Sequence, residues 1–494
     1  MTFTSPLYFL FWPAAFLVFY FSRDKYRWLV LLLASLAFYA ALKAPSLLIA
    51  LTGVTVLTYF SGRGVAAAMS PGRKTLVFWL GVTANLAILI GFRYFAVLIE
   101  GLNVLSGAIG GGRHVFAAVD PISIGVSYYS FQAISYLVDV YLDVEKPEKH
   151  FGYFALYISF FPKLLQGPIE RAGDFLPQLR QPYVFCYENV RSGLLLFAWG
   201  LFKKVVISDR LALFVNEVYG NVHAFSGLPL IIATYFYAFQ IYCDFSGYTD
   251  MALGTGRIFN FKLTQNFDNP YRATSIAMFW RRWHISFSRW ILDYIFKPLQ
   301  FRFRYWRDWG TALALVITFL ACGVWHGATA GFVIWGLLHG LYMSCSVLYR
   351  GLGKRFRRKK RNPTALIDAW RVIATFHLVC LAWIFFRARS LADAFYVINY
   401  AMVGLPSSLV RLAKRDSLVH DIYLNQSNKE FFLAVACLGL LAVLARATTA
   451  HEAAVRAFRQ WAPVWLRWSA YLGFVLAVVV FGVFYGGAFI YFQF

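Results

Sequence analysis

Apolar runs recur along the whole chain, and their lengths constrain the fold more than any other feature of the sequence. They cover residues 7–21, 28–42, 46–60, 75–92, 122–142, 193–207, 228–243, 313–325, 331–348, 372–386, 431–445 and 465–492. A helix needs about 20 apolar residues to cross a bilayer, and a spanning segment must satisfy its own backbone hydrogen bonds. We therefore expect an all-α polytopic integral membrane protein with about 10–12 tilted transmembrane helices, and re-entrant or interfacial helices where the runs are short.

Composition supports a single membrane domain. Hydrophobic residues make up 60% of the 494 residues and charged residues only 14%. We find no linker rich in proline, glycine and serine and no repeat of fixed period, so one integral domain over residues 1–494 is expected. The first apolar run lacks a basic leader and a small-residue cleavage site, which predicts a retained span with Met1 outside.

The basic residues lie in short loops between apolar runs. Arg23, Lys25 and Arg27 follow the first run, and a basic cluster occupies residues 354–361. The positive-inside rule places these loops in the cytoplasm, where the cluster can contact anionic lipid or, as the alternative, an anionic ligand. Because the basic residues lie in these loops and not along one soluble face, the net charge of +24 does not indicate a nucleic-acid partner, and we expect none. The six cysteines lack metal-ligand spacing, so we predict no metal site.

A stretch without Asp, Glu, Lys or Arg, Gly310–Tyr349, carries His326 and His339 among aromatic and aliphatic residues. Hydrocarbon around an imidazole disfavours its charged form and leaves few water partners, so a polar group there usually has a partner or a function. His326 lies between glycines in Gly323–Gly327, which permits close approach of a ligand or another backbone. We predict that His326 is catalytic and that His339 is a structural core histidine.

A second aromatic and basic motif, Phe279–Trp290, contains His284 together with Arg281, Arg282 and Arg289. On one continuous helix its tryptophans would share a face and its arginines would reach the membrane interface, so an amphipathic interfacial helix is one reading. The alternative is a site in which His284 has a chemical role. The surrounding region, residues 245–308, is too polar to face lipid and is expected to be buried in protein or to line a cavity.

Two further polar clusters follow apolar runs. Asp244, Ser246 and Asp250 fall within seven residues; they either cap a following helix or hold a histidine or an arginine in place. Lys203, Lys204 and Asp209 form the other cluster, for which we predict a structural ion pair.

Signatures of soluble hydrolases and phosphate-binding loops are absent, including GxSxG, a Walker loop and HExxH. What remains is a base in an apolar surrounding, which suits deprotonation of a hydroxyl group. At this point the residues carry a resemblance to the membrane-bound O-acyltransferase (MBOAT) family, and within it to the members that O-acetylate alginate. The resemblance runs from about Leu7 to the last apolar run and is densest in Pro121–Tyr129, Gln166–Ile169, Asp244–Asp250, Asn266–Tyr271, Phe279–Trp290 and Gly323–Gly327.

The resemblance implies a ring of helices around a tunnel, with His326 as the essential catalytic residue and His284 as the second polar residue of the site. Asp244, Ser246, Asp250, Asn266 and Trp325 belong to the same motifs as supporting residues. No tightly bound cofactor is expected. We expect acetyl-CoA as the donor, entering from the cytoplasm, with its phosphates attracted by basic residues at the tunnel mouth, namely Arg281, Arg282, Arg289 and Lys297.

The resemblance also implies a bacterial inner-membrane location and a periplasmic or extracellular acetyl-relay partner with an SGNH, serine-hydrolase-like, fold, within a polysaccharide biosynthesis complex. Residues 403–430 form a polar loop that we predict carries a surface helix and docks this partner. The segment Lys297–Arg304 departs from alginate-type members, so the acceptor stays open among alginate, cellulose and peptidoglycan, with D-alanyl transfer to teichoic acid as a further alternative. A transporter or flippase, and a non-catalytic assembly subunit, are the rival classes.

Overall fold

The structure, a computed structural model, describes residues 1–108, 124–355, 364–413, 428–446, 461–484 and 489–490. Every regular element in these ranges is helical, which confirms the prediction of an all-α protein. The chain divides into two compact units: Met1–Phe197 with Tyr248–Gln265, and Ala198–Gly247 with Asn266–Phe494. The single integral domain stays a prediction.

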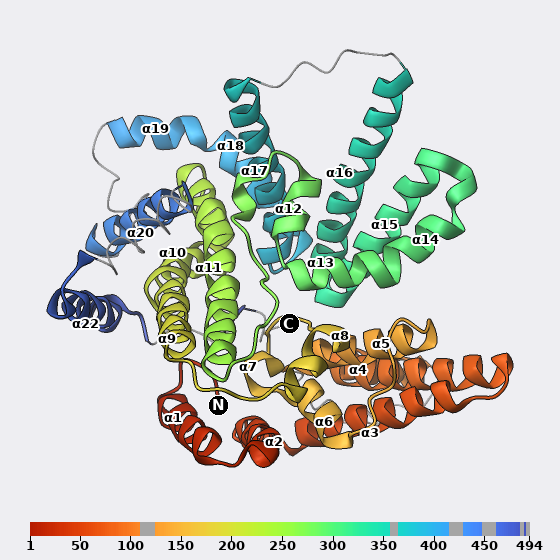
Figure 1. Cartoon of the computed structure of the whole chain (residues 1–494). Coiled ribbons are helices and arrows are strands. Elements are labelled where there is room, and N and C mark those ends of the chain that lie inside the picture. The colour runs from red at the N-terminus through yellow and green to blue at the C-terminus, as the bar shows by residue number, and fades with distance from the viewer. Residues whose placement is uncertain (109–123, 356–363, 414–427, 447–460, 485–488, 491–494) are drawn as a thin grey trace. The chain divides into compact units, whose positions relative to one another are not determined.

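The first unit consists mainly of the N-terminal helices, which Figure 1 draws from red to yellow. Their bounds are α1 Pro6–Phe21, α2 Asp24–Ala40, α3 Pro45–Ala67, α4 Pro71–Ala108, α5 Val126–Tyr141, α6 Phe151–Ser159, α7 Phe161–Leu164, α8 Ala172–Phe175 and η1 Leu176–Arg180. Proline in the first turn starts α1 and α3, where its missing N–H has no intrahelical partner to lose. Helices α3, α4 and α5 pack against one another, and α2 packs on α6.

Two long helices belong to both units: α9, Tyr187–Phe202, and α11, Leu228–Ile258, each of which contains a unit boundary. The rest of the second unit includes several one- and two-turn helices between α11 and the next long helix. Its elements are η2 Lys203–Ser208, α10 Asp209–Gly220, η3 Val222–Ala224, η4 Pro270–Arg272, α12 Ile276–Arg282, α13 Ile285–Ile291, η5 Leu292–Phe296, α14 Lys297–Arg302, η6 Arg304–Trp306, α15 Arg307–His326, α16 Ala330–Arg355, α17 Ala365–Arg387, α18 Leu391–Val403, α19 Leu405–Ala413, α20 Asn428–Arg446 and α22 Val464–Phe481.

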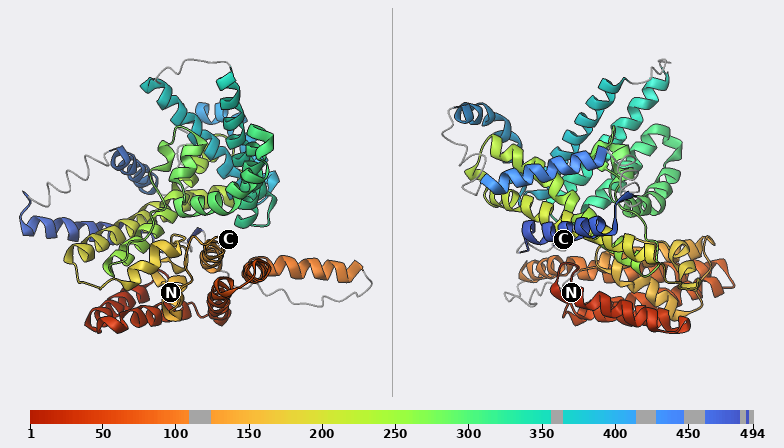
Figure 2. Two further views of the ribbon diagram at one scale, coloured as in Figure 1. Left: turned by 45° about the vertical axis from the view of Figure 1, so that its right-hand side comes forward. Right: turned by 60° about the vertical axis from the view of Figure 1, so that its left-hand side comes forward.

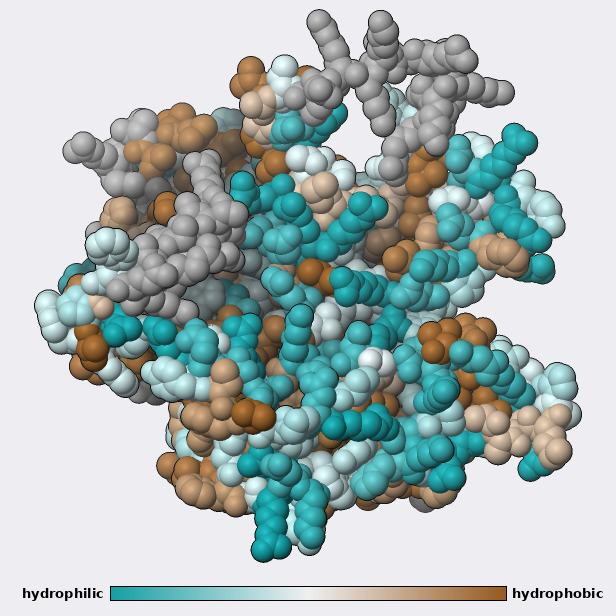
Figure 3. Space-filling view, viewed as in Figure 1, coloured by the Kyte–Doolittle hydropathy of each residue, from teal (hydrophilic) through white to brown (hydrophobic). Residues whose placement is uncertain are grey.

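Seven helices in the described part of the chain are long and apolar enough to cross a membrane. They are Pro45–Ala67, Pro71–Tyr94, Leu228–Ile258, Arg304–His326, Ala330–Tyr349, Ala365–Arg387 and Val464–Phe481, with α1 and α18 as shorter apolar helices. Apolar side chains lie at the surface in many places (Figure 3), and on α22 Trp465 and Trp468 are 68% and 65% exposed. Exposed apolar faces of this extent match a lipid surrounding and confirm a multi-pass membrane protein.

The pair α15–α16 is the most closely packed pair of helices in the second unit, and the views in Figures 1 and 2 agree in placing the two side by side. Glycines permit this approach. A Cβ atom on Gly323 would lie 2.4 Å from the carbonyl oxygen of Phe332, and one on Gly336 would lie 2.3 Å from that of Phe319. Three residues join the helices, so the two run antiparallel. Direct backbone contact therefore fixes the end of α15, where His326 lies.

Candidate active site

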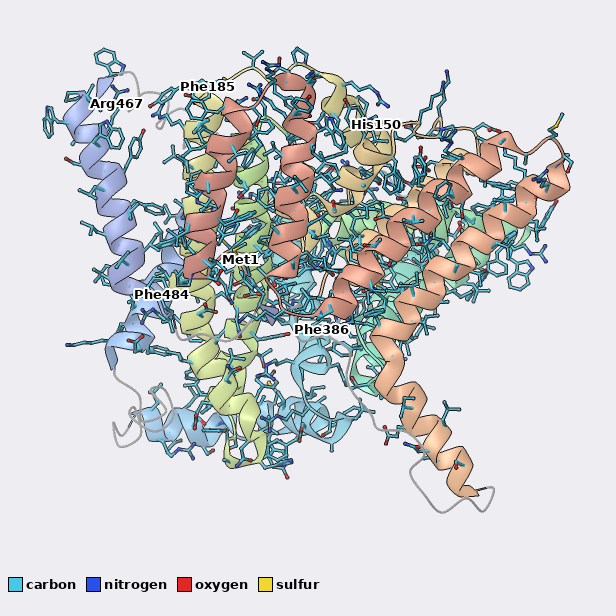
Figure 4. All side chains as sticks on the ribbon, turned by 90° about the horizontal axis from the view of Figure 1, so that it is seen from below. Met1, His150, Phe185, Phe386, Arg467 and Phe484 are labelled. Atoms are coloured by element: carbon cyan, nitrogen blue, oxygen red, sulfur yellow. The ribbon has the colours of Figure 1, made fainter. Side chains whose placement is uncertain are left out.

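His326 is the last residue of α15 and is only 4% exposed. Aromatic rings surround its imidazole: the ring centroids of Trp325, Trp335 and Phe386 lie 4.5, 4.9 and 5.1 Å away. Trp335 comes from α16, and Phe386, labelled in Figure 4, comes from the last turn of α17. Three consecutive long helices thus build an apolar enclosure around one imidazole.

His284 lies in a break between α12 and α13, where its backbone is left-handed (φ 43°, ψ 58°). The continuous interfacial helix considered over Phe279–Trp290 is therefore wrong: two short helices meet at the histidine. His284 is 2% exposed, and its ring contacts Phe245 at 4.6 Å and Phe287 at 5.0 Å between centroids. Left-handed backbone at a residue other than glycine costs about 1–2 kcal/mol, so neighbouring contacts must hold it.

Asn266 supplies those contacts. Its side-chain Oδ1 accepts hydrogen bonds from the backbone N–H and the hydroxyl of Ser286, at 3.1 and 2.7 Å. Its backbone oxygen accepts from the N–H of Ile285 at 2.9 Å, and the N–H of Asp268 donates to the oxygen of Arg282 at 3.0 Å. Asn266 is fully buried. The segment that begins at Asn266 therefore clamps both sides of His284, which gives this predicted supporting residue a definite structural role.

Phe287 connects the two histidines. Its ring centroid lies 5.0 Å from that of His284 and 6.5 Å from that of His326, and it stacks on Trp325 at 4.5 Å. The structure therefore brings together His326, His284, Trp325 and Asn266, all of which the sequence analysis had proposed as site residues. The two histidines come from motifs more than 40 residues apart in the sequence.

Burial lowers the pKa of His284 to about 3. His284 lies outside the seven candidate spans, yet its ring is enclosed by aromatic side chains that disfavour a charge. The imidazole is consequently neutral at physiological pH, and a neutral imidazole offers one N–H donor and one acceptor.

A cavity of about 580 Å³ lies beside α13, and its lining is mainly apolar. Of the four basic residues predicted to bind the donor, Arg281 and Arg289 line it. Arg282 instead approaches Asp268 at 3.9 Å, and Lys297 forms an ion pair with Asp293 at 2.7 Å. Trp280 also lines this cavity; its ring lies 5.9 Å from that of Trp335, which contacts His326. Part of the region 245–308 thus lines a cavity, which is one of the two alternatives expected for it.

A second cavity, of about 280 Å³, has a more polar lining and shares two aromatic neighbours with His326. Phe332 and Phe386, whose rings contact that of His326, line it, together with Arg387 and Arg389. Two buried polar side chains, Tyr237 and Gln240, also line it.

Asp244 and Ser246 take roles other than those expected. Both lie inside α11, which continues to Ile258, so neither caps a following helix. Asp244 also holds neither a histidine nor an arginine: its Oδ1 accepts from Lys204 Nζ at 2.7 Å, and its Oδ2 accepts from the backbone N–H of Ile490 at 2.8 Å. Ser246 accepts from Lys203 Nζ at 2.9 Å.

The predicted ion pair of the neighbouring cluster is confirmed, because Lys204 Nζ also contacts Asp209 at 2.8 Å. Two carboxylates therefore share one buried ammonium group. Burial raises the pKa of Asp209 to about 7, opposed by the charge of Lys204. Asp250 belongs to the part of α11 in the first unit.

The sequence reasoning missed part of the site's support. His339, read as a core histidine, lies on α16 one turn after Trp335, and its Nδ1 accepts a hydrogen bond from Trp280 Nε1 at 3.2 Å. The spacing of Trp335 and His339 by four residues, within the stretch that lacks charges, was the available signal.

Other predictions fall partly outside the described residues. The structure does not describe most of the basic cluster 354–361 or about half of the polar loop predicted over 403–430. The described part of that loop contains the predicted helix, α19. Among the residues that the structure describes, no group of three His, Cys, Asp or Glu side chains is arranged to hold a metal ion. The absence of a metal stays a prediction.

Comparison with known proteins agrees with this geometry. The model of the MBOAT, membrane-bound O-acyltransferase family, matches residues 126–388, which include both histidines and every residue that lines the larger cavity. The chain is 34% identical over 453 residues to a peptidoglycan O-acetyltransferase of Helicobacter pylori, covering 84% of this chain and 82% of that one. The chain belongs to the membrane-bound O-acyltransferase family and is an acyltransferase.

Two more relatives show the range of the family. A probable alginate O-acetylase AlgI of Pseudomonas aeruginosa is 34% identical over 402 residues, covering 80% of this chain and 73% of the relative. A teichoic acid D-alanyltransferase of Bacillus subtilis is 26% identical over 289 residues, covering 54% and 69%.

Proposed function

We propose that this protein moves an acetyl group from cytoplasmic acetyl-CoA, through His326, toward O-acetylation of an extracytoplasmic polysaccharide. The observation that carries the proposal is that ring contacts link His326 to two cavities of different character. Trp280 and Trp335 connect it by ring contacts to the larger cavity, and Phe332 and Phe386 connect it to the smaller one.

The positive-inside rule supports this direction. By this rule the basic cluster at the end of α16 favours a cytoplasmic position for that helix end, and the antiparallel packing then favours the same side for the start of α15. The larger cavity is lined by Thr311, Met343 and Val347, from those two cytoplasmic ends. The smaller cavity is lined by Thr329, which directly precedes α16, and by Arg387, the last residue of α17. Donor and acceptor would thus approach His326 from opposite sides.

The larger cavity suits an acyl thioester of coenzyme A. Its apolar lining can hold the acyl end, and Arg281 and Arg289, both exposed, add positive charge that attracts phosphates. Arg282 and Lys297 have carboxylate neighbours, so we assign them a smaller part in donor binding.

In the proposed reaction His326 takes the proton from an acceptor hydroxyl as its oxygen attacks the acetyl carbonyl carbon. The new C–O bond forms, the C–S bond breaks, and the imidazolium returns the proton to the coenzyme A thiolate. His284, being neutral, donates a hydrogen bond to the oxyanion or orients the reactants. General-base catalysis contributes about 10²–10⁴-fold and an oxyanion donor about 10²–10³-fold.

The acceptor that we propose is a polysaccharide such as alginate, reached through a periplasmic partner with an SGNH-like fold. The relatives support the class, since by name one acts on peptidoglycan and another on alginate; cellulose stays an alternative from the sequence alone. The described helix α19 and the loop after it are the proposed docking surface. Replacing residues 414–427 by a short linker should abolish co-purification with the partner; intact complex formation would refute the docking role.

The test of the function is transfer of labelled acetyl from acetyl-CoA in membranes that contain the chain and its partner. His326→Ala should lower transfer at least about 10²-fold, and His284→Ala should lower it as well. The matched control is His377→Ala, an exposed histidine on α17, which should retain activity. Equal transfer by wild type and His326→Ala would remove His326 from the chemistry. No transfer by any variant would reject acetyl-CoA as donor.

A further inference from the structure

The segment Lys297–Trp309, at the start of the candidate span Arg304–His326, displays basic and aromatic side chains together on the surface. We call eight of its exposed residues the basic–aromatic patch: Lys297, Arg302, Arg304 and Arg307 with Phe301, Tyr305, Trp306 and Trp309. The four aromatic side chains are 67%, 79%, 60% and 71% exposed, in that order. The segment contains one acidic residue, Asp308. Positive charge and apolar area are therefore combined on one short stretch of chain.

The arginines of the patch have no counter-charge. Among the residues that the structure describes, no carboxylate forms an ion pair with Arg302, Arg304 or Arg307, whereas Lys297 has Asp293. Arg304 instead lies over the rings of two neighbours in the patch, at 4.2 and 4.5 Å, and donates to the hydroxyl of one of them at 2.8 Å. These neighbours are neutral, so the positive charge stays available to an anion. A guanidinium group carries five N–H donors, more than these contacts use.

Close packing at the end of the segment fixes the patch beside the larger cavity. Helix α14 packs on α15 (Figure 1), and a Cβ atom on Gly310 would overlap the carbonyl oxygen of Phe303. Gln300 Nε2 donates to Thr311 Oγ1 at 3.4 Å, which joins the two helices again. The segment is flanked by Phe296 and Thr311, and both of these line the larger cavity. The patch therefore adjoins this cavity at both of its ends.

We propose that the basic–aromatic patch binds the phosphate headgroup of an anionic phospholipid in the cytoplasmic leaflet. The positive-inside rule, which favours the cytoplasm for the start of α15, favours that leaflet for the patch. An anionic leaflet attracts each nearby Lys or Arg, which strengthens binding about 5-fold per residue. Tryptophan and tyrosine favour the headgroup layer, where one end of the ring is apolar and the other is wet. The exposed rings argue against a soluble phosphate compound as the occupant, because it would leave most of their area in water.

A bound headgroup also has a consequence for the cavity, and this part rests on the proposed function. A ligand that binds one arrangement of a segment raises the population of that arrangement. Because Phe296 and Thr311 flank the patch and line the larger cavity, a lipid on the patch stabilises one form of the cavity border. Acetyl transfer should accordingly be faster in a membrane that contains anionic phospholipid.

The experiment measures which phospholipid stays with the full chain. The chain is reconstituted in equal amounts of phosphatidylcholine and phosphatidylglycerol and extracted in mild detergent, and the retained lipids are quantified by mass spectrometry. Wild type should retain phosphatidylglycerol over phosphatidylcholine about 10-fold or more. The triple variant Arg302→Gln, Arg304→Gln, Arg307→Gln should lower this ratio about 10-fold or more, because three charges are lost.

A matched control removes the same charge elsewhere. Arg73→Gln, Arg257→Gln and Lys262→Gln together remove three exposed basic residues of the first unit and should leave the ratio unchanged. If the triple patch variant fails to accumulate, Arg302→Gln alone should lower the ratio about 5-fold.

Three results would overturn the proposal. Equal retention of both lipids by wild type would make the patch a plain interfacial anchor, and a wild-type ratio in the patch variant would place the bound lipid elsewhere. An unchanged lipid ratio with weaker acetyl-CoA binding, measured by calorimetry in phosphatidylcholine alone, would assign the arginines to the phosphates of coenzyme A.

Transfer assays separate this inference from the proposed function. Labelled acetyl transfer is compared in phosphatidylcholine with and without phosphatidylglycerol, at matched protein level. Absence of transfer in both lipids would reject the proposed function, while the retained-lipid ratio would still test the patch. Equal transfer in both, with phosphatidylglycerol retained on the patch, would reject only the effect of the lipid on the cavity.

Discussion

Replacing Asn266 by alanine removes the side-chain part of the clamp on His284 and keeps its backbone hydrogen bonds. The side chain of Asn266 accepts two hydrogen bonds from buried Ser286, at 3.1 and 2.7 Å, and alanine leaves both donors without their acceptor. Each buried donor left unpaired costs about 1–3 kcal/mol. Release of the left-handed backbone at His284 returns about 1–2 kcal/mol, so we expect a net loss of about 3 kcal/mol of stability.

The rate of acyl transfer should fall even at temperatures at which the variant stays folded. A reacting group displaced by about 1 Å loses about 10²-fold in rate, and Asn266 fixes the segment on both sides of His284. The assay measures the thermal midpoint of the purified chain in detergent and acyl transfer at matched protein level, below that midpoint. Ser286→Ala removes the hydroxyl bond to Asn266, keeps the backbone bond and should cost about 1 kcal/mol.

A matched control lies in the other unit. Asn189, partly buried, donates to Asn260, and Asn189→Ala should have a small effect on both measurements. The reasoning is refuted if Asn266→Ala equals wild type in stability, or if it loses stability and keeps full transfer at permissive temperature. The first result would deny the clamp, and the second would deny that His284 must be held for turnover.

Three further changes have expected outcomes. Lys204→Met leaves two buried carboxylates without their cation and should cost about 3–5 kcal/mol in thermal unfolding, whereas Lys74→Met breaks an exposed pair and should cost less than about 1 kcal/mol; equal losses would contradict this. Gly336→Ala forces α15 and α16 apart and should lower the yield of folded protein, while Gly439→Ala, with open space around it, should not. The folded pKa of His284, about 3, lies below its usual 6.5, so stability is lost as pH falls below 6.5; wild type should lose about 2 kcal/mol more than His284→Gln between pH 7.5 and 5, and parallel pH profiles would be the contrary result.

The sequence predicted the fold class and the helices because both follow from local patterns. Within the described residues each apolar run lies on helical segments, although the last run extends past the end of α22 at Phe481, since lipid leaves the backbone no other partner than itself. Motif chemistry likewise selected His326 and His284. The break of the helix at His284 could not be foreseen, because it depends on Asn266, which is distant along the chain.

Charge partners were the least predictable part of the site. Asp244 was expected beside a histidine or an arginine, yet a π-helical turn at Lys203–Ser208 brings Lys204 to it instead. The hydrogen bond between Trp280 and His339 spans 59 residues and joins two helices that no local pattern connects. Such pairings depend on tertiary packing, which a single sequence does not specify.

The glycine contacts between α15 and α16 have a consequence for how this scaffold can diversify. The position of the His326 imidazole is set by carbonyl oxygens and α-carbons of two helices in direct contact, and these do not change when side chains do. Lining residues that do not contact the imidazole ring can therefore be exchanged without moving the helix end that carries the base. To change the donor or acceptor specificity, side chains that line the two cavities can be replaced while the backbone that carries His326 keeps its position.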